Sequence, residues 1–199
     1  MWKKWLGKCL IIIIGAIIAG VGISMAVHTG YGNATLAVLW QGISRCTGLS
    51  MGITSFLVAL IMIVFVFFYD RKQIHIGTVL FQIFYSGAIG ICGHIGFQTT
   101  YAVVNFMLMI IGILVLGFGT GLYAVVNMGR GSYEALCFAI AEKHHWQIRY
   151  VRAVWDAIFV IIGILLGGKI GLCTIFTILL TGNVIQLTVK LMGKFNEKN

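Results

Sequence analysis

The chain has 199 residues, of which 60% are hydrophobic and 10% are charged, and it contains no proline. Soluble domains carry about 25% charged and about 45–50% apolar residues, so this composition excludes a soluble globular enzyme, a disordered chain and a disulfide scaffold. The mean hydropathy of +1.01 favours an all-α polytopic membrane protein, with a single transmembrane domain over residues 1–199.

Six apolar stretches are long enough, or nearly so, to cross a bilayer, which takes about 20 helical residues. They are residues 9–27, 51–69, 76–94, 102–126, 151–168 and 170–189. The fifth is the weakest candidate because it is short and contains Asp156. The first follows three lysines but has no small-residue cleavage site, so we expect a retained span rather than a signal peptide.

Two shorter segments, 33–46 and 132–145, each follow a Gly-x-Gly turn and open with a residue that favours helix N-caps, Asn33 or Ser132. At about 13 residues, neither is long enough to span the bilayer comfortably. We therefore predict two re-entrant or interfacial helices.

The two halves of the chain resemble each other. A shift of 99 residues, or slightly fewer toward the end, matches Gly20 and Gly22 with Gly119 and Gly121, one Gly-x-Gly turn with the other, Thr78 with Thr174, and Ser86-Gly87 with Thr181-Gly182. The pattern indicates two repeats, about 9–95 and 102–190, each with three spans and one short helix. Internal repeats are a recurring device of transporters.

Lysine and arginine predict the orientation, because they accumulate in cytoplasmic loops. With six spans and a cytoplasmic N-terminus, 12 of the 14 fall inside and only Arg45 and Lys169 outside, whereas eight spans give a split of 10 to 4. Six spans place both termini in the cytoplasm and make the repeats inverted. The net charge of +9 sits at span ends, which favours contact with anionic lipid headgroups over nucleic-acid binding.

The Gly-x-Gly turns are candidates for a solute site, because helix N-termini attract anions and broken helices near the bilayer midplane form transporter sites. Ionisable residues within spans are a second signal. Arg152 and Asp156 share a helix face, so they also fit a structural ion pair, and the glycines also fit plain turning and packing. The candidate substrate-binding residues are Gly30, Gly32, Asn33, Gly129, Gly131, Ser132, Glu134, Arg152 and Asp156.

Motifs for catalysis are not found. The sequence has no nucleophile elbow, no Walker loop and no H-E-x-x-H, and its five cysteines show no C-x-x-C spacing. We therefore expect no enzyme activity, no metal site and no cofactor.

Several stretches together resemble the YczE/YitT-like family of bacterial integral membrane proteins. They are Met128-Gly-Arg-Gly-Ser-Tyr-Glu-Ala-Leu-Cys, Trp155-Asp156, Gly171-Leu-Cys-Thr and Thr181-Gly-Asn-Val-Ile-Gln. The family pattern has Pro-Trp-Asp where this chain has Ser132, Tyr133 and Glu134, and Gly-Thr at Cys173-Thr174. The chain ends at Asn199 without the soluble C-terminal domain of YitT relatives, so it looks closer to YczE. The resemblance implies a bacterial cell (plasma) membrane location more firmly than an activity.

These observations predict a small-solute transporter of unknown substrate that works by alternating access, with its site where the two Gly-x-Gly turns approach each other. The alternative is a non-transporting membrane subunit, such as an assembly or substrate-binding partner of a larger complex, or a homo-oligomer.

Overall fold

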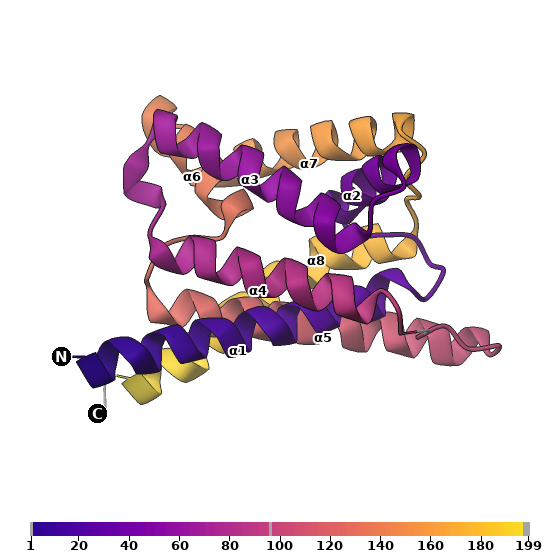
Figure 1. Cartoon of the computed structure of the whole chain (residues 1–199), viewed down its shortest axis with the longest axis horizontal. Helices are drawn as coiled ribbons and strands as arrows, with labels where there is room; N and C mark the ends of the chain where they lie inside the picture. The colour runs from indigo at the N-terminus through magenta and orange to yellow at the C-terminus, as the bar shows by residue number, and fades with distance from the viewer. Residues whose placement is uncertain (1, 96, 197–199) are drawn as a thin grey trace.

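The computed structural model describes residues 2–95 and 97–196, and these form helices only, without a strand (Figure 1). The elements are α1 (Trp2–Val27), α2 (Thr35–Thr47), α3 (Met51–Tyr69), the 3-10 helix η1 (Arg71–Gln73), α4 (Ile76–Cys92), α5 (Ala102–Val126), α6 (Ser132–His144), α7 (Ile148–Leu165) and α8 (Leu172–Asn196). Each of the six predicted apolar stretches and both predicted short segments is a helix.

Four of these helices, α1, α3, α5 and α8, are long and apolar enough to cross a membrane. The helix α4 is apolar but has 17 residues, and the 18 residues of α7 include Arg149, Arg152 and Asp156. The apolar side chains on the outside of the bundle are widely exposed, as expected for helices that face lipid. The chain is therefore built as a multi-pass helical membrane protein, and six crossings remain a prediction.

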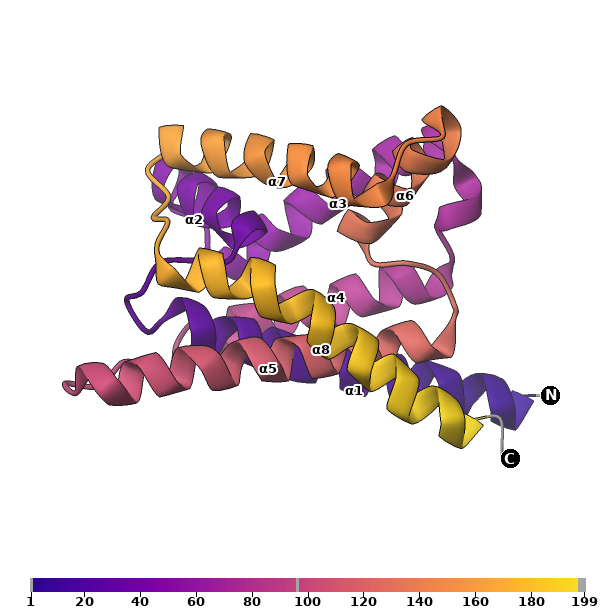
Figure 2. The same ribbon diagram turned by 180° about the vertical axis from the view of Figure 1, so that it is seen from behind.

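The helices form two layers (Figures 1 and 2). One layer holds α4, α1, α5 and α8 side by side, and the other holds α2, α3, α6 and α7. In the first layer α1 and α5 cross closely through glycines. A Cβ on Gly15 would lie 2.8 Å from the carbonyl oxygen of Gly119, and a Cβ on Gly22 would lie 2.7 Å from that of Gly112. Residue numbers rise along α1 as they fall along α5, so the two helices are antiparallel.

The short helices α2 and α6 lie in the second layer, begin near its middle and run toward opposite ends of the molecule (Figures 1 and 2). Both chain termini lie at the end toward which α6 runs. We call this the terminal end and the other the distal end. The N-terminal turns of α2 and α6 therefore face the interior of the bundle, as a re-entrant helix requires.

The layers are joined on one side by α3 and α4. Gly52 packs on Gly90, where a Cβ on Gly52 would lie 2.6 Å from the Gly90 Cα, and the Ser55 hydroxyl donates to the Ser86 hydroxyl at 2.9 Å. We call this the α3–α4 interface. The corresponding pair on the other side, α7 and α8, scarcely touch over their described residues.

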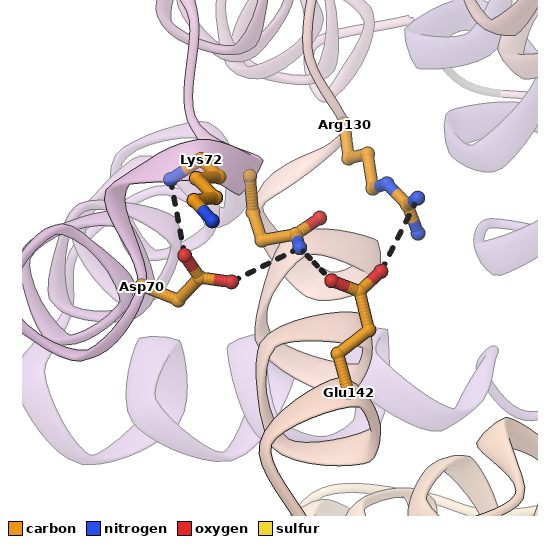
Figure 3. A network of polar contacts seen from close by, with 5 residues as sticks. Asp70, Lys72, Arg130 and Glu142 are labelled. Carbon is orange, nitrogen blue, oxygen red and sulfur yellow. Dashed lines mark hydrogen bonds and ion pairs between the residues drawn. The ribbon is translucent and has the colours of Figure 1, made fainter. Parts of the chain in front are cut away.

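Each short helix is held by a loop of the opposite half of the chain. At the terminal end, Gln73 Nε2 donates to Asp70 Oδ2 (3.1 Å) and to Glu142 Oε2 on α6 (2.7 Å), and Arg130 pairs with Glu142 at 3.7 Å (Figure 3). We call this group the terminal latch.

At the distal end the partners are α2 and the loop between α7 and α8. Asn33 Nδ2 donates to Gln41 Oε1 (2.8 Å) and to the Lys169 carbonyl (2.9 Å), and the Lys169 N–H donates to Gln41 Oε1 (2.7 Å). Arg45 donates to the Gly167 carbonyl. We call this group the distal latch. The two halves therefore interlock, each completing the other.

Candidate functional site

A cavity of about 670 Å³ lies between the two layers. Its size is within the range of cavities that hold small organic ligands, about 300–1,000 Å³. Its walls come from every α-helix except α3, and most of them are apolar. The polar and charged side chains on its wall are Thr35, Gln82, Tyr85, Thr120, Ser132, Tyr133, Glu134, Arg149, Arg152, Asp156, Thr174, Thr177 and Thr181.

The cavity brings together five of the nine candidate residues from the sequence. Gly131, Ser132, Glu134, Arg152 and Asp156 line it. All five belong to the second half of the chain. The other four, Gly30, Gly32, Asn33 and Gly129, lie outside its wall, because the residues that reach the cavity begin at Ala34 before α2 and at Gly131 before α6.

The glycines of the two Gly-x-Gly turns pack closely on other elements, whereas Ala34 and Gly131, at the ends of these turns, line the same cavity. Gly32, with φ of +89°, packs on Gly171, where a Cβ on Gly32 would lie 2.5 Å from the Gly171 nitrogen. Gly129, with φ of +111°, packs on Thr78, where a Cβ would lie 2.5 Å from Oγ1. Gly32 and Gly129 thus each need glycine both for a positive φ and for close approach to the other half of the chain, to the loop before α8 and to α4 respectively.

Neither Asn33 nor Ser132 is the N-cap of its helix, in contrast to the prediction. Ala34 is the N-cap of α2 and makes no side-chain cap, because alanine has no side-chain acceptor, while the Asn33 amide is engaged in the distal latch. Gly131 is the N-cap of α6, and Ser132 is the first residue of the helix.

Ser132 begins a buried chain of polar contacts that runs from the cavity wall into the α3–α4 interface. Its hydroxyl donates to Gln82 Oε1 at 3.1 Å, and Gln82 Nε2 donates to the Ser86 hydroxyl at 2.7 Å. Ser86 in turn accepts from Ser55. All four side chains are buried. This chain satisfies polar groups that would be costly to leave unpaired in the bundle.

Asp156 does not pair with Arg152, in contrast to the structural ion pair that their spacing allows. Its Oδ1 accepts a hydrogen bond from the Tyr133 hydroxyl at 2.8 Å. The Arg152 guanidinium lies over the Tyr133 ring, 5.3 Å from the ring centre, and has no ion pair or side-chain hydrogen bond with any described residue. A half-buried cation thus lines the cavity with its donors unused.

The two short helices present different N-termini to the cavity. In α6 the Glu134 carboxylate folds back over Gly131, so a negative charge lies in the first turn, at the positive end of the helix. In α2 the first turn has no acidic residue and the N-cap has no side-chain acceptor. The electropositive start of α2, at Thr35, Leu36 and Ala37, is therefore left open toward the cavity.

Among the wall residues that sequence reasoning missed, three stand out by their chemistry. Tyr133 supplies the partner of Asp156, Arg149 adds a second cation, and Trp40 is 4% exposed with its indole nitrogen buried and lacking a hydrogen-bond partner in the described structure. Tyr133 could have been found from the sequence, because it lies between the two candidate residues Ser132 and Glu134. Nothing in the hydropathy pattern separates Trp40 from a tryptophan at the membrane interface.

Comparison with known proteins gives a consistent assignment. A model of a family of unknown function, DUF6198, matches residues 6–190. An uncharacterised protein of Haemophilus influenzae is 29% identical over 194 residues, covering 98% of this chain and 88% of the relative. The uncharacterised membrane protein YczE of Bacillus subtilis is 23% identical over 176 residues, covering 88% and 82%.

A second Bacillus subtilis relative, the uncharacterised protein YyaS, is 26% identical over 193 residues, covering 94% of each chain. No solved structure matches the chain significantly. The resemblance to YczE noted in the sequence is confirmed, and a family match over residues 6–190 covers most of the chain. The protein is therefore a membrane protein that belongs to the DUF6198 family.

Proposed function

We propose that the protein is a carrier that moves a small solute across the bacterial cell membrane by alternating access. The observation that carries the proposal is the cavity of about 670 Å³. Two half-length helices, α2 and α6, begin at this cavity and run from it toward opposite ends of the molecule. Half-helices that meet a polar cavity near the bilayer midplane are the arrangement by which many secondary transporters form their sites.

The contacts support the predicted inverted repeats. The helices α1 and α4 of the first repeat correspond to α5 and α8 of the second, and each pair is in close contact. The equivalents of α2 with α7 are α6 with α3, and these also pack together. The antiparallel crossing of α1 and α5 is the arrangement that an odd number of spans in each repeat requires.

The orientation follows from the charges at the two ends. The terminal end carries η1, the C-terminus of α6 and the N-terminus of α7, with Arg71, Lys72, Lys143 and Arg149. The distal end carries Arg45 and Lys169. The bias of lysine and arginine toward cytoplasmic loops favours a cytoplasmic position for the terminal end and both termini.

In this mechanism the two latches are the gates. Rocking one repeat against the other separates Gln73 from Glu142 on the cytoplasmic side, or Asn33 from Lys169 on the outer side, and opens the cavity to one side at a time. Glu134 and Asp156 are the residues that would carry a coupled proton, because they are the acidic groups on the cavity wall.

Alternating access is tested by thiol labelling. Cys9, Cys46, Cys92, Cys137 and Cys173 are first replaced by alanine, and Ser132→Cys is then introduced on the cavity wall. A membrane-impermeant maleimide is added to right-side-out and to inside-out vesicles. We expect labelling from both sides, whereas the control Arg71→Cys reacts from the cytoplasmic side only. Labelling of Ser132→Cys from a single side, or from neither, would contradict the carrier.

Transport itself is tested with liposomes that contain this chain alone. The liposomes are incubated with a defined mixture of metabolites, and their contents are read by mass spectrometry. A proton-coupled carrier accumulates at least one compound, and Glu134→Gln abolishes the accumulation while the protein elutes from a sizing column as before. Unchanged uptake by Glu134→Gln would remove that residue from the mechanism.

The alternative, a non-transporting subunit, is favoured by one observation. The space between α7 and α8 is bounded by exposed apolar side chains such as Ile161 and Ile178, which a helix of a partner protein could cover. That role predicts co-purification of a second membrane protein in mild detergent and no uptake by the chain alone.

A further inference from the structure

The cavity has a side entrance. Ala153 and Ala157 of α7, and Ile178 and Gly182 of α8, line the cavity and are exposed to solvent. The two helices scarcely touch over their described lengths, so the cavity reaches the surface between them. We call this opening the α7–α8 gap. In a membrane it faces acyl chains, because most of the exposed residues of α7 and α8 are apolar, although Arg149, Asn183 and Gln186 are exposed as well.

The gap arises from a difference between the halves. The second and fifth residues of α3 are Gly52 and Ser55, which close the α3–α4 interface. The second and fifth residues of α7 are Arg149 and Arg152, and both line the cavity. Small residues that draw two helices together are thus replaced by long cationic side chains at the corresponding place.

The polar groups of the cavity favour an anion. Asp156 accepts the Tyr133 hydrogen bond and Glu134 lies at the N-terminus of α6, so both carboxylates already have electropositive partners. The Arg152 guanidinium lies over the Tyr133 ring but has no ion pair or side-chain hydrogen bond with a described residue, and the N-terminus of α2 has neither an acidic residue nor a side-chain cap. The wall therefore offers free donors at Arg152 and at the start of α2, which suit a carboxylate or a phosphate, beside the Glu134 carboxylate and the Thr181 hydroxyl, which make no hydrogen bond with a described residue.

We propose that the cavity binds a single-chain anionic amphipath, which enters from the bilayer through the α7–α8 gap and places its acidic group on Arg152. The mostly apolar wall holds the chain, and the donors of Arg152 and the open N-terminus of α2 hold the head group. This names the substrate class of the carrier proposed above and in that sense rests on it. Binding, however, is measured without transport, so the two can fail separately.

The test uses Trp40, which lies in the cavity wall, as the reporter. Trp2, Trp5, Trp146 and Trp155 are replaced by phenylalanine, and the protein is placed in liposomes of unlabelled phosphatidylcholine. A long-chain fatty acid brominated midway along its chain is added as a contact quencher. We expect saturable quenching of Trp40. The primary amine with the same brominated chain tests the charge preference on the same protein, and we expect at least tenfold weaker binding.

Two substitutions locate the route and the head group. Gly182→Phe fills the gap, where a Cβ would meet nothing within 4 Å, and we expect it to abolish the saturable quenching. Gly87→Phe is the matched control at the corresponding place on α4, where a Cβ is equally free, and it leaves quenching unchanged. Arg152→Gln weakens binding by about tenfold or more, as the loss of a hydrogen bond to a charged group does.

Other outcomes overturn the proposal. Absent or non-saturable quenching would show that no amphipath occupies a defined site. Equal quenching by the acid and the amine would remove the anion preference, and equal effects of Gly182→Phe and Gly87→Phe would remove the lateral route. Quenching by a brominated two-chain phosphatidylglycerol in the bilayer, undiminished by the fatty acid, would assign the cavity to bulk lipid. Saturable binding without uptake would keep the site and refute the carrier.

Discussion

The α3–α4 interface and the α7–α8 gap occupy corresponding places in the two halves, yet one is closed and the other open. In the first, Gly52 lies against Gly90 and Ser55 bonds to Ser86. In the second, α7 begins with Arg149 and Arg152 and has no glycine before Gly163. The comparison teaches that small residues in the first two turns of α3 join the two layers on the side of α3 and α4. Where arginines take their place in α7, the layers stay apart and the charged side chains line the cavity.

The largest expected effect comes from breaking the closed side. Gly52→Leu forces a side chain against the Gly90 backbone, where even a Cβ would lie 2.6 Å from Cα. Overpacking of this kind typically costs about 1–3 kcal/mol, and we expect the upper end because the neighbour is backbone. The free energy of unfolding in detergent measures the loss. An unchanged value would show that α3 and α4 do not depend on this contact.

A smaller loss of unfolding free energy is expected when the hydrogen bond between α6 and α7 is removed. Tyr133→Phe removes the hydrogen bond from α6 to Asp156 and leaves a partly buried carboxylate without that donor, at a cost of about 1–3 kcal/mol. The same unfolding measurement applies. Addition of Asp156→Asn to Tyr133→Phe recovers part of the loss, because the amide carries no charge. Equal stability of Tyr133→Phe and the unmodified protein would show that Asp156 finds another donor.

The Ser55–Ser86 hydrogen bond across the α3–α4 interface is expected to contribute less to the free energy of unfolding than the contacts above. Ser55→Ala, Ser86→Ala and the double variant form a cycle whose coupling energy we expect to be about 0.6 kcal/mol, the usual value for hydrogen bonds between membrane helices. Coupling near zero would leave the glycine contact as the main cause of closure.

The smallest change in the free energy of unfolding is expected for a substitution in the α7–α8 gap. Gly182→Leu adds a side chain where a Cβ meets nothing within 4 Å, so the free energy of unfolding stays within about 0.5 kcal/mol of the original. A loss as large as that of Gly52→Leu would mean that α7 and α8 are closed in the protein under study, and the contrast between the two sides would disappear.

The helices could be predicted from the sequence because the apolar runs are long and are separated by charges or glycines. The runs at 51–69 and 102–126 coincide with α3 and α5. The half-helices were also predictable, since each is short and follows a Gly-x-Gly turn. These features depend on neighbouring residues only.

The site was less predictable because its contacts join distant residues. The Asn33 amide bonds to the carbonyl of Lys169, 136 positions away, so a residue that looks like an N-cap serves the distal latch. Arg152 and Asp156 have helical pairing distance, but Tyr133 from another helix bonds to the carboxylate instead. Local spacing singled out five residues of the second half that line the cavity, but it did not predict the partners of Asn33 and Asp156.

The interlocking of the halves has a consequence for biosynthesis. When the ribosome has released α1 to α4 into the bilayer, the loop at 166–171 that anchors α2 does not yet exist, and the loop at 70–75 has no α6 to hold. The first half must therefore wait in the membrane with its short helix unsecured, and the native assembly can form only after the last hairpin has been inserted.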